Sequence, residues 1–300
     1  MDFLNRRAAA IRSAGYARTD ALHEDPDPRQ GHYFPELHNT LRDPRLRQVQ
    51  WLDLVSVKPL QVAFELALPA LWLVASLIAA AEGLVVVALG LSFMFFLTGL
   101  RLIHNAFHVA VGLSHTGTEI VLWAMSAVIL GSMHAVRFTH LTHHRLNLSP
   151  EDVEGRHAQM PGWRALLQGP YFTVLMHVTA FRQGRWPLRA TIAAQLLMNA
   201  ALVVLAFRYW TWTPLRCHVC AMGVGHCLTA FFAVWTVHHH CDRSHHIART
   251  LRNRILNAVT FNMFLHIEHH LFPLVPTCHL GDLSRRIDEI APELKRKLVF

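Results

Sequence analysis

Four long apolar stretches constrain the fold of this chain more than any other feature of its sequence. A helix needs about 20 mostly apolar residues to cross a bilayer, and the stretches that come close to this length are residues 59–81, 84–103, 190–207 and 214–237. Only Glu82 and Gly83 separate the first two, and the short sequence RYWTWT joins the last two. We therefore expect four transmembrane helices in two hairpins. A hydrophobic content of 52% agrees, because it is high for a soluble enzyme.

Three histidine clusters accompany these stretches. HNAFH contains His104 and His108, HLTHH contains His140, His143 and His144, and HIEHH contains His266, His269 and His270. In a helix, residues i, i+3 and i+4 share one face, so each HxxHH box points three imidazoles at one place. Because 23 of the 300 residues are histidine, chance gives about two HxxxH matches but only about a tenth of an HxxHH match. The two HxxHH boxes therefore predict a metal site, whereas HNAFH alone is weak evidence.

A fifth apolar stretch, residues 117–135, lies between the first two histidine clusters. If it crossed the bilayer, His104 and His108 would face the opposite side from the HLTHH box, and the clusters could not share a site. We therefore expect this stretch to lie in the interface, or to enter the membrane and return on the same side. Gly131 and Ser132 are available for the bend.

Basic residues predict the orientation of the chain, because they favour the cytoplasmic side. Such residues precede the first span (Arg6, Arg7, Arg12, Arg18, Arg42, Arg45, Arg47 and Lys58 among them), precede the third (Arg182, Arg185 and Arg189) and follow the fourth (Arg243, Arg249, Arg252, Arg254, Lys295, Arg296 and Lys297 among them). The charged residues on the other side are only Glu82, Arg208 and Arg216. We expect residues 1–50 to form a polar N-terminal cytoplasmic segment and residues 51–300 an integral membrane domain. Both termini and the histidine boxes would then be cytoplasmic. The net charge of +8 follows mostly from this bias, and it could also attract anionic lipid headgroups. No nucleic acid partner is expected.

A fourth cluster, His238, His239 and His240, begins where the fourth span ends. Eight box histidines plus one from this cluster exceed the coordination shell of a single ion, so the number predicts two metals. Imidazole suits zinc, copper, iron and nickel alike, so the ligand type leaves the metal open. The pair Cys217 and Cys220 also has a metal-binding spacing, but no second pair accompanies it.

The order HNAFH, HLTHH and HIEHHLFPLVP, set between two pairs of spans, resembles the membrane fatty acid desaturase and hydroxylase superfamily over about residues 50–290. The resemblance implies a non-haem di-iron centre that activates O2, with no catalytic residues beyond the metal ligands. It also implies a separate electron donor such as ferredoxin or a cytochrome. The implied ligands are the eight box histidines, together with one histidine after the fourth span. For this position His239 is the first candidate and His238 the second.

Within this reading the fold is an all-α membrane protein with a cytoplasmic helical cap that carries the boxes. Glu268 is a candidate either for a ligand or for holding a ligand ring by a hydrogen bond. Asp242, Asp152 and Glu154 are further candidates for such hydrogen bonds, although a solvated or capping role is the more common one. The substrate would be an acyl chain lying between the spans. The candidate contacts there are Phe93, Phe95, Phe96 and Phe107, for which core or lipid-facing packing is the alternative. The leading activity is that of an acyl desaturase. The alternatives are a hydroxylase or ketolase acting on an acyl chain, a carotenoid or another lipophilic molecule.

A metal transporter is a remote alternative, because transport needs polar groups along the membrane path. The spans here are nearly uncharged, and the box histidines gather at one face. His226 in the fourth span and Asn199 in the third are polar residues inside the apolar stretches, and we expect them to pair. The basic residues Lys58, Arg101 and Arg137, together with Arg145, could meet a phosphate or extend to the interface.

Overall fold

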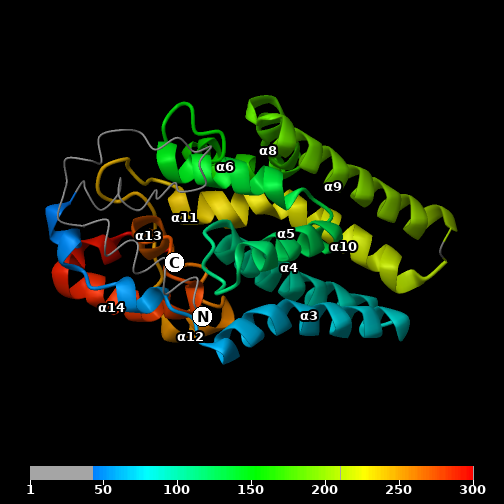
Figure 1. The fold of residues 1–300 in the computed structure, drawn as a ribbon, viewed down its shortest axis with the longest axis horizontal. Helices are drawn as coiled ribbons and strands as arrows, with labels where there is room; N and C mark the ends of the chain where they lie inside the picture. Colours follow the sequence, from blue (N-terminus) through cyan, green and yellow to red (C-terminus); the bar gives the residue numbers. More distant parts are fainter. Residues whose placement is uncertain (1–42, 210, 300) are drawn as a thin grey trace.

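The computed structural model describes residues 43–209 and 211–299, and this part of the chain is helical with one isolated β-bridge between Thr250 and Leu298. Four helices are long and apolar enough to cross a membrane: Pro59–Ala81, Val85–Phe107, Trp186–Tyr209 and Thr213–His238. Each lies within four residues of a predicted stretch at both ends. Figure 1 shows them extending toward one end of an elongated molecule, with the C-terminal helices at the other end.

The first two spans, α3 (Pro59–Ala81) and α4 (Val85–Phe107), pack against each other along their length. Gly83 makes the tight connection possible because its backbone adopts a φ of 75°, which a glycine tolerates without strain. The third span consists of α9 (Trp186–Val204) and the π-helical η6 (Leu205–Tyr209). The fourth consists of α10 (Thr213–Thr229), the π-helical η7 (Ala230–Trp235) and α11 (Thr236–His238).

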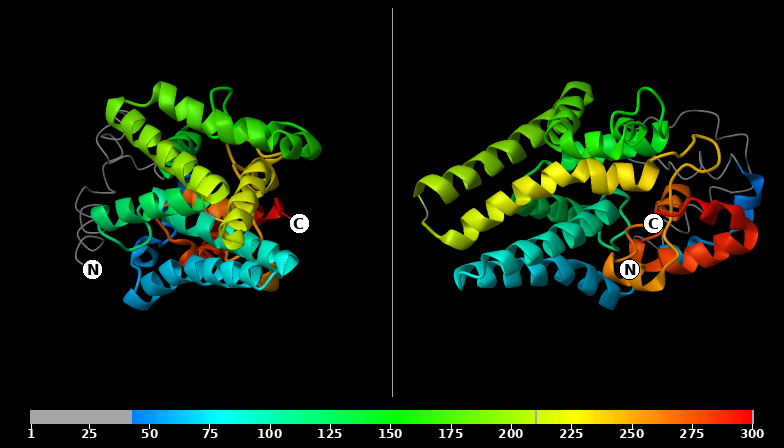
Figure 2. Two further views of the ribbon diagram at one scale, coloured as in Figure 1. Left: turned by 90° about the vertical axis from the view of Figure 1, so that its right-hand side faces the viewer. Right: turned by 180° about the vertical axis from the view of Figure 1, so that it is seen from behind.

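The third and fourth spans meet at their far ends and diverge toward the other end of the molecule (Figure 2). α10 packs against α3, α4 and α8 (Gly169–Gln183), whereas α9 packs against α5, α6 and α8. α5 (His115–Ile129) and α6 (Met133–Leu146) form the bent pair that the fifth apolar stretch encodes, with an angle of 110° between them. The predicted bend at Gly131 and Ser132 is confirmed. This pair and α8 occupy the space between the diverging spans.

Polar side chains from three other helices bind the backbone at the break between α5 and α6. A helix end leaves carbonyl and N–H groups without partners, and such groups are costly where no water reaches them. From α10, His218 Nε2 donates to the Val128 carbonyl (2.7 Å) and His226 Nε2 donates to the Ile129 carbonyl (2.8 Å). From α8, His177 Nε2 accepts from Ser132 N–H (2.9 Å). From α9, the Asn199 amide donates to the Ser126 carbonyl (2.9 Å) and accepts from Gly131 N–H (3.0 Å). The predicted pairing of His226 with Asn199 is wrong, because each of these side chains binds the backbone of the break instead.

The other end of the molecule is a cap built from the C-terminal residues and the start of the described chain. Its elements are η3 (Pro44–Gln48), η4 (Leu52–Val55), α12 (Arg254–Val259), α13 (His266–Leu271), η8 (Thr277–His279), α14 (Leu280–Ile290) and η9 (Pro292–Arg296). α14 buries Leu280, Leu283, Ser284 and Ile287, which follow the i, i+3, i+4, i+7 spacing of one helix face. Trp51 and Phe272 pack against each other in the same core, with ring centroids 5.5 Å apart and the ring planes tilted by 46°.

The boundary at residue 50 stays a prediction. Residues 46–55, which lie on both sides of this boundary, pack into the core of the cap. Residues 1–42 lie outside the described part. The loop after α6 contains η5 (Gly155–Gln159), and α7 (Gly162–Leu167) leads into α8.

Candidate metal centre

The histidine boxes come from four separate elements that end at the same level of the molecule. His104 lies in the last turn of α4 and His108 caps it. The HLTHH box occupies the second half of α6, and the HIEHH box forms most of α13. His238 is the last residue of the fourth span. The ends of two spans, the bent pair and the cap therefore meet at the boxes.

The structure brings these rings into two adjacent groups. One contains His104, His108, His140, His144 and His269, and the other contains His143, His238 and His270; within each group, one ring nitrogen per residue lies within 4.8 Å of the others. His266 adjoins the second group, with its Nε2 3.0 Å from that of His238 and 3.2 Å from that of His270. Nine of the ten candidate histidines therefore meet here.

His239 is the candidate that does not reach either group. Its ring stacks on Trp235 with the centroids 4.0 Å apart, and its Nδ1 donates to the Trp235 carbonyl at 2.8 Å. His238, the second candidate at this position, is buried and lies in the second group. The structure therefore favours His238 over His239 as the histidine contributed by the fourth span.

Hydrogen bonds at Nδ1 decide which nitrogen of three rings carries the proton. His143 Nδ1 is 2.7 Å from an Asp152 carboxylate oxygen, His238 Nδ1 is 3.1 Å from the Ile247 carbonyl, and His140 Nδ1 is 3.2 Å from a Glu154 carboxylate oxygen. Because these partners only accept, Nδ1 is protonated, and Nε2 of each neutral ring carries a lone pair. The Nε2 atoms of His143 and His238 nevertheless lie 3.1 Å apart. Burial lowers the pKa of His143, but the charge and hydrogen bond of Asp152 outweigh this and raise it to about 9, so a proton or a metal ion lies between these two nitrogens.

The spacing of the ring nitrogens fits ligands that share one ion. Two nitrogens about 2.1 Å from a first-row metal, at an angle between tetrahedral and octahedral values, lie about 3.0–3.4 Å apart. The observed Nε2 separations are 3.1 Å for His108 and His140, 3.1 Å for His140 and His144, and 3.0 Å for His144 and His269. The first group therefore has the geometry of a coordination shell.

The chemical state of the cap histidines also suits metal binding. His266, His269 and His270 are buried, and burial together with the neighbouring imidazoles lowers the pKa of each ring well below its usual value. These rings are therefore neutral at physiological pH, and the neutral imidazole is the form that binds metals.

Two carboxylates hold rings of the HLTHH box from behind. Asp152 is buried and accepts from the N–H groups of Leu148 (2.8 Å) and Gly155 (2.9 Å) in addition to His143. Burial alone would raise its pKa, but the charge and hydrogen bond of His143 outweigh this and lower the pKa to about 2. Asp152 is therefore ionised, and Glu154 has the equivalent position behind His140. Such carboxylates orient a metal-binding ring and raise its basicity.

The other two candidate carboxylates have different partners. Glu268 is fully buried, accepts from the Thr250 hydroxyl (2.8 and 3.0 Å) and forms an ion pair with Arg252 at 2.6 Å. Burial raises its pKa, although the charge of Arg252 opposes the shift. Asp242 accepts from backbone N–H groups of the turn at residues 244–246. Glu268 thus fastens α13 to the segment before α12, and Asp242 stabilises a turn.

A family model described as fatty acid desaturase matches residues 79–299 of this chain. The chain belongs to the fatty acid desaturase family. No curated protein and no solved structure matches it, so the family model alone supports this assignment. Membership implies an integral membrane di-iron oxidase with a lipophilic substrate and O2, and the two histidine groups fit iron as a ligand set.

Of the phenylalanines and cysteines considered in the sequence, Phe107 lies against a grouped ring, with its centroid 5.7 Å from that of His140. Phe95, Phe96 and Phe107 are buried in a core cluster, whereas Phe93 is 48% exposed. Cys217 and Cys220 are free thiols, and they are in neither of the two metal-binding groups found among the described residues.

Two of the four basic candidates are paired inside the structure. Arg101 forms a buried ion pair with Glu65, and Arg137 binds Glu119 at 3.2 Å. Glu65 was missed by the sequence analysis, although it is the one acidic residue inside the first apolar stretch and such residues usually have a task. His177, Gln195 and His218 were also missed; Gln195 accepts from the Ser132 hydroxyl at 2.7 Å, so all three bind the α5–α6 pair at its break.

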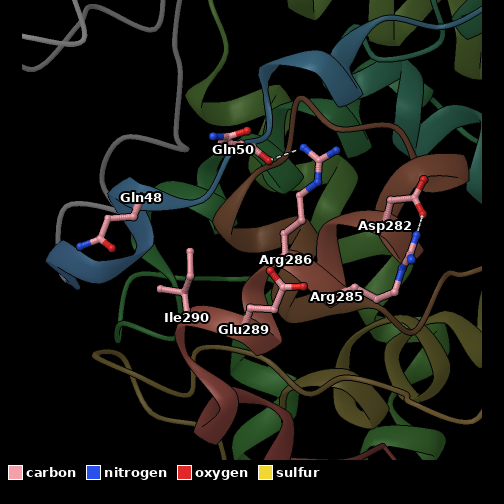
Figure 3. A pocket seen from close by; sticks show the side chains of 7 residues that line it. All are labelled: Gln48, Gln50, Asp282, Arg285, Arg286, Glu289 and Ile290. Carbon is pink, nitrogen blue, oxygen red and sulfur yellow. Dashed lines mark hydrogen bonds and ion pairs between the residues drawn. The ribbon is translucent and has the colours of Figure 1, made fainter.

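The pocket drawn in Figure 3 is a separate feature of the cap. It is lined by Gln48, Gln50, Asp282, Arg285, Arg286, Glu289 and Ile290. Its arginines are already engaged, Arg286 with Asp53 at 2.6 Å and with the Gln50 carbonyl, and Arg285 with Asp282. None of the grouped histidines lines this pocket, so it is not part of the metal centre.

Proposed function

We propose that this protein is a fatty acyl desaturase, which introduces a double bond into an acyl chain using O2 and two electrons from a separate donor such as ferredoxin or a cytochrome. The observation that carries the proposal is the pair of adjacent histidine groups, in which ring nitrogens lie at separations that fit ligands of a shared ion. One iron would be held by His104, His108, His140, His144 and His269, and the other by His143, His238, His266 and His270. When bound, the two irons supply the oxidation of an unactivated C–H bond.

The chain's own residues would keep the ligand rings neutral, fix their orientation and exclude water from them. Asp152 and Glu154 fix the orientation of their partner rings through Nδ1, so that Nε2 points into the site. Burial of the rings excludes the water that would otherwise compete for the ligand positions. An acyl chain lying between the spans would reach the site from the membrane, because the rings lie where α4 and the fourth span end.

The proposed orientation places the boxes, the cap and both termini on the cytoplasmic side of two transmembrane hairpins. Basic residues support this orientation, because they are concentrated before the first and third spans and after the fourth. A cytoplasmic electron donor would then have direct access to the cap.

Metal analysis of the detergent-purified protein, combined with lipid and pigment profiling of a host that expresses it, tests the proposal. Two irons per chain and a new unsaturated acyl chain are expected. Two irons with an oxygenated acyl or carotenoid product would replace desaturation by hydroxylation or ketolation. Zinc without a change in the lipids would refute the proposed chemistry.

Alanine substitutions test the ligand assignment. His143→Ala and His269→Ala should each abolish activity and lower the iron content, because each removes a ligand from a different group. His245→Ala is the matched control, since His245 is a cap histidine near Glu293 and outside both groups. Turnover at the wild-type rate in either ligand variant would exclude that residue from the site.

A further inference from the structure

The segment of residues 261–277 is attached to α4 at both of its ends. Arg101 Nη1 donates to the Phe261 carbonyl at 2.9 Å. At the other end the Asn105 amide makes a double hydrogen bond with Thr277, donating to its hydroxyl at 2.9 Å and accepting from its N–H at 3.1 Å. Between these two attachments the segment carries all three histidines of the HIEHH box. The helix of the first box therefore holds the third box through side chains that bind no metal.

The attachment depends on a buried ion pair between the first two spans. Glu65 on α3 and Arg101 on α4 are 3% and 4% exposed. Arg101 Nε donates to Glu65 Oε2 at 3.0 Å, and Nη2 donates to the other carboxylate oxygen. Buried ion pairs of this kind are often no better for stability than apolar residues of similar volume. Packing of the α3–α4 hairpin alone therefore does not require these charges, whereas the bond to Phe261 does.

The turn that Arg101 binds has an unusual backbone conformation. Phe261 has a φ of 52° and Asn262 a φ of 63°, which is the left-handed region that bulky residues avoid. Such conformations persist where surrounding contacts hold them. Here the contacts are Arg101 on the Phe261 carbonyl and the Asn262 amide on the Thr277 carbonyl at 3.1 Å. The turn is therefore held from α4 and from the far end of its own segment.

The same stretch of α4 places the first box. Arg101 precedes His104 by three residues, and Asn105 precedes His108 by three. The rings of His104 and His269 meet with their centroids 4.0 Å apart. A shift of residues 261–277 along α4 would therefore change the distance between ligands of the first and third boxes directly.

We propose that Glu65, Arg101, Asn105 and Thr277, the Arg101 network, are positioning residues that hold the HIEHH box at the distance from α4 that the metal centre requires. The inference rests on the proposed function, which identifies these rings as ligands. The network touches no metal, and its effect is exerted through the backbone of residues 261–277.

Two sets of variants separate positioning from stability. The double variant Glu65→Leu/Arg101→Met removes both charges together, so no charge is left buried without a partner, but it cannot bind the Phe261 carbonyl. Thr277→Val removes the hydroxyl that Asn105 binds, and Thr277→Ser is its control because it keeps the hydroxyl. The measurements are the thermal unfolding midpoint, the rate at which an Fe(II) chelator removes iron, and amide hydrogen exchange across residues 261–277.

The double variant should unfold at or above the wild-type midpoint, yet release iron about tenfold faster, the lower end of the range for residues that orient ligands. Amides of residues 261–277 should exchange faster in it. Thr277→Val should also release iron faster, and Thr277→Ser should return to the wild-type rate. If the double variant unfolds earlier, the Thr277 variants decide, because Thr277 lies outside the hairpin. Equal iron release by Thr277→Val, Thr277→Ser and the wild type would overturn the proposal.

The experiment also distinguishes failure of this inference from failure of the proposed function. A wild-type protein that binds no iron refutes the function. The inference is then judged on hydrogen exchange in the metal-free protein, where unchanged protection of residues 261–277 in both variants would overturn it.

Discussion

The break between α5 and α6 allows a quantitative test of how this fold tolerates irregular backbone inside the membrane. His226→Leu removes the donor to the Ile129 carbonyl, and Asn199→Leu removes two bonds, to the Ser126 carbonyl and from Gly131 N–H. Leucine is chosen because it fills most of the space that the polar side chain leaves.

The magnitude follows from the bonds that are lost and from the backbone groups that are left without a partner. One unsatisfied buried group costs about 1–3 kcal/mol, whereas hydrogen bonds between membrane helices average only about 0.6 kcal/mol. We therefore expect His226→Leu to lower the free energy of unfolding by about 1 kcal/mol. Asn199→Leu should cost about the same although it removes two bonds, because Gly131 N–H still donates to the Ser126 carbonyl at 3.3 Å and neither group is left without a partner.

Unfolding of the purified protein in mixed micelles, with increasing denaturing detergent, measures these differences. Val224→Ala is the control, because Val224 is on the same helix as His226 and is 59% exposed. Both leucine variants should also lose iron faster than the control, since α6 carries the HLTHH box directly after the break. Unfolding free energies equal to that of the control in both variants would refute the role assigned to these side chains.

Three further predictions concern single positions. His238→Ala should lower the iron content of the purified protein while His239→Ala keeps it, and metal analysis giving the reverse would restore His239 as the ligand. Gly169→Ala should destabilise the protein by about 1–3 kcal/mol, because the new Cβ would lie 1.6 Å from a backbone carbonyl oxygen of α10. Gly223→Ala has open space around it and should stabilise the helix by about 0.5–1 kcal/mol. Thermal unfolding should therefore give a lower midpoint for the first variant and a higher one for the second. Burial raises the pKa of the Cys278 thiol to about 11, so alkylation of the folded protein should be slow at pH 8 and accelerate as the pH rises toward 11; mass spectrometry that finds rapid labelling at pH 8 would contradict this.

Much of the architecture could be predicted from local sequence rules. The four spans follow from apolar length, and each structural helix agrees with its predicted stretch within four residues. The bend at Gly131 and Ser132 followed from the requirement that histidines before and after it reach one site. These inferences succeed because they depend on short-range periodicity and on the thickness of a bilayer.

The choice between His238 and His239 shows where such rules stop. The fourth span contains a π-helical segment, Ala230–Trp235, directly before the histidine cluster, and the Thr236 hydroxyl donates to the carbonyl of Phe231 five residues back. A π-helical turn takes more residues than an α-helical one, so it changes which later residue faces the core. The sequence contains no recognisable signal for this segment, and the register of the three adjacent histidines depends on it.

The sequence alone determined that this chain is a helical membrane protein with histidine clusters that can hold metal, because hydrophobic length and helical spacing are local properties. Tertiary structure decided which side chains serve that site: Asp152 and Glu154 orient rings, Glu268 does not, and Arg101 binds a turn 160 residues away in the chain. The physical reason is that a hydrogen bond depends on distance and direction between groups, and packing of remote segments sets both.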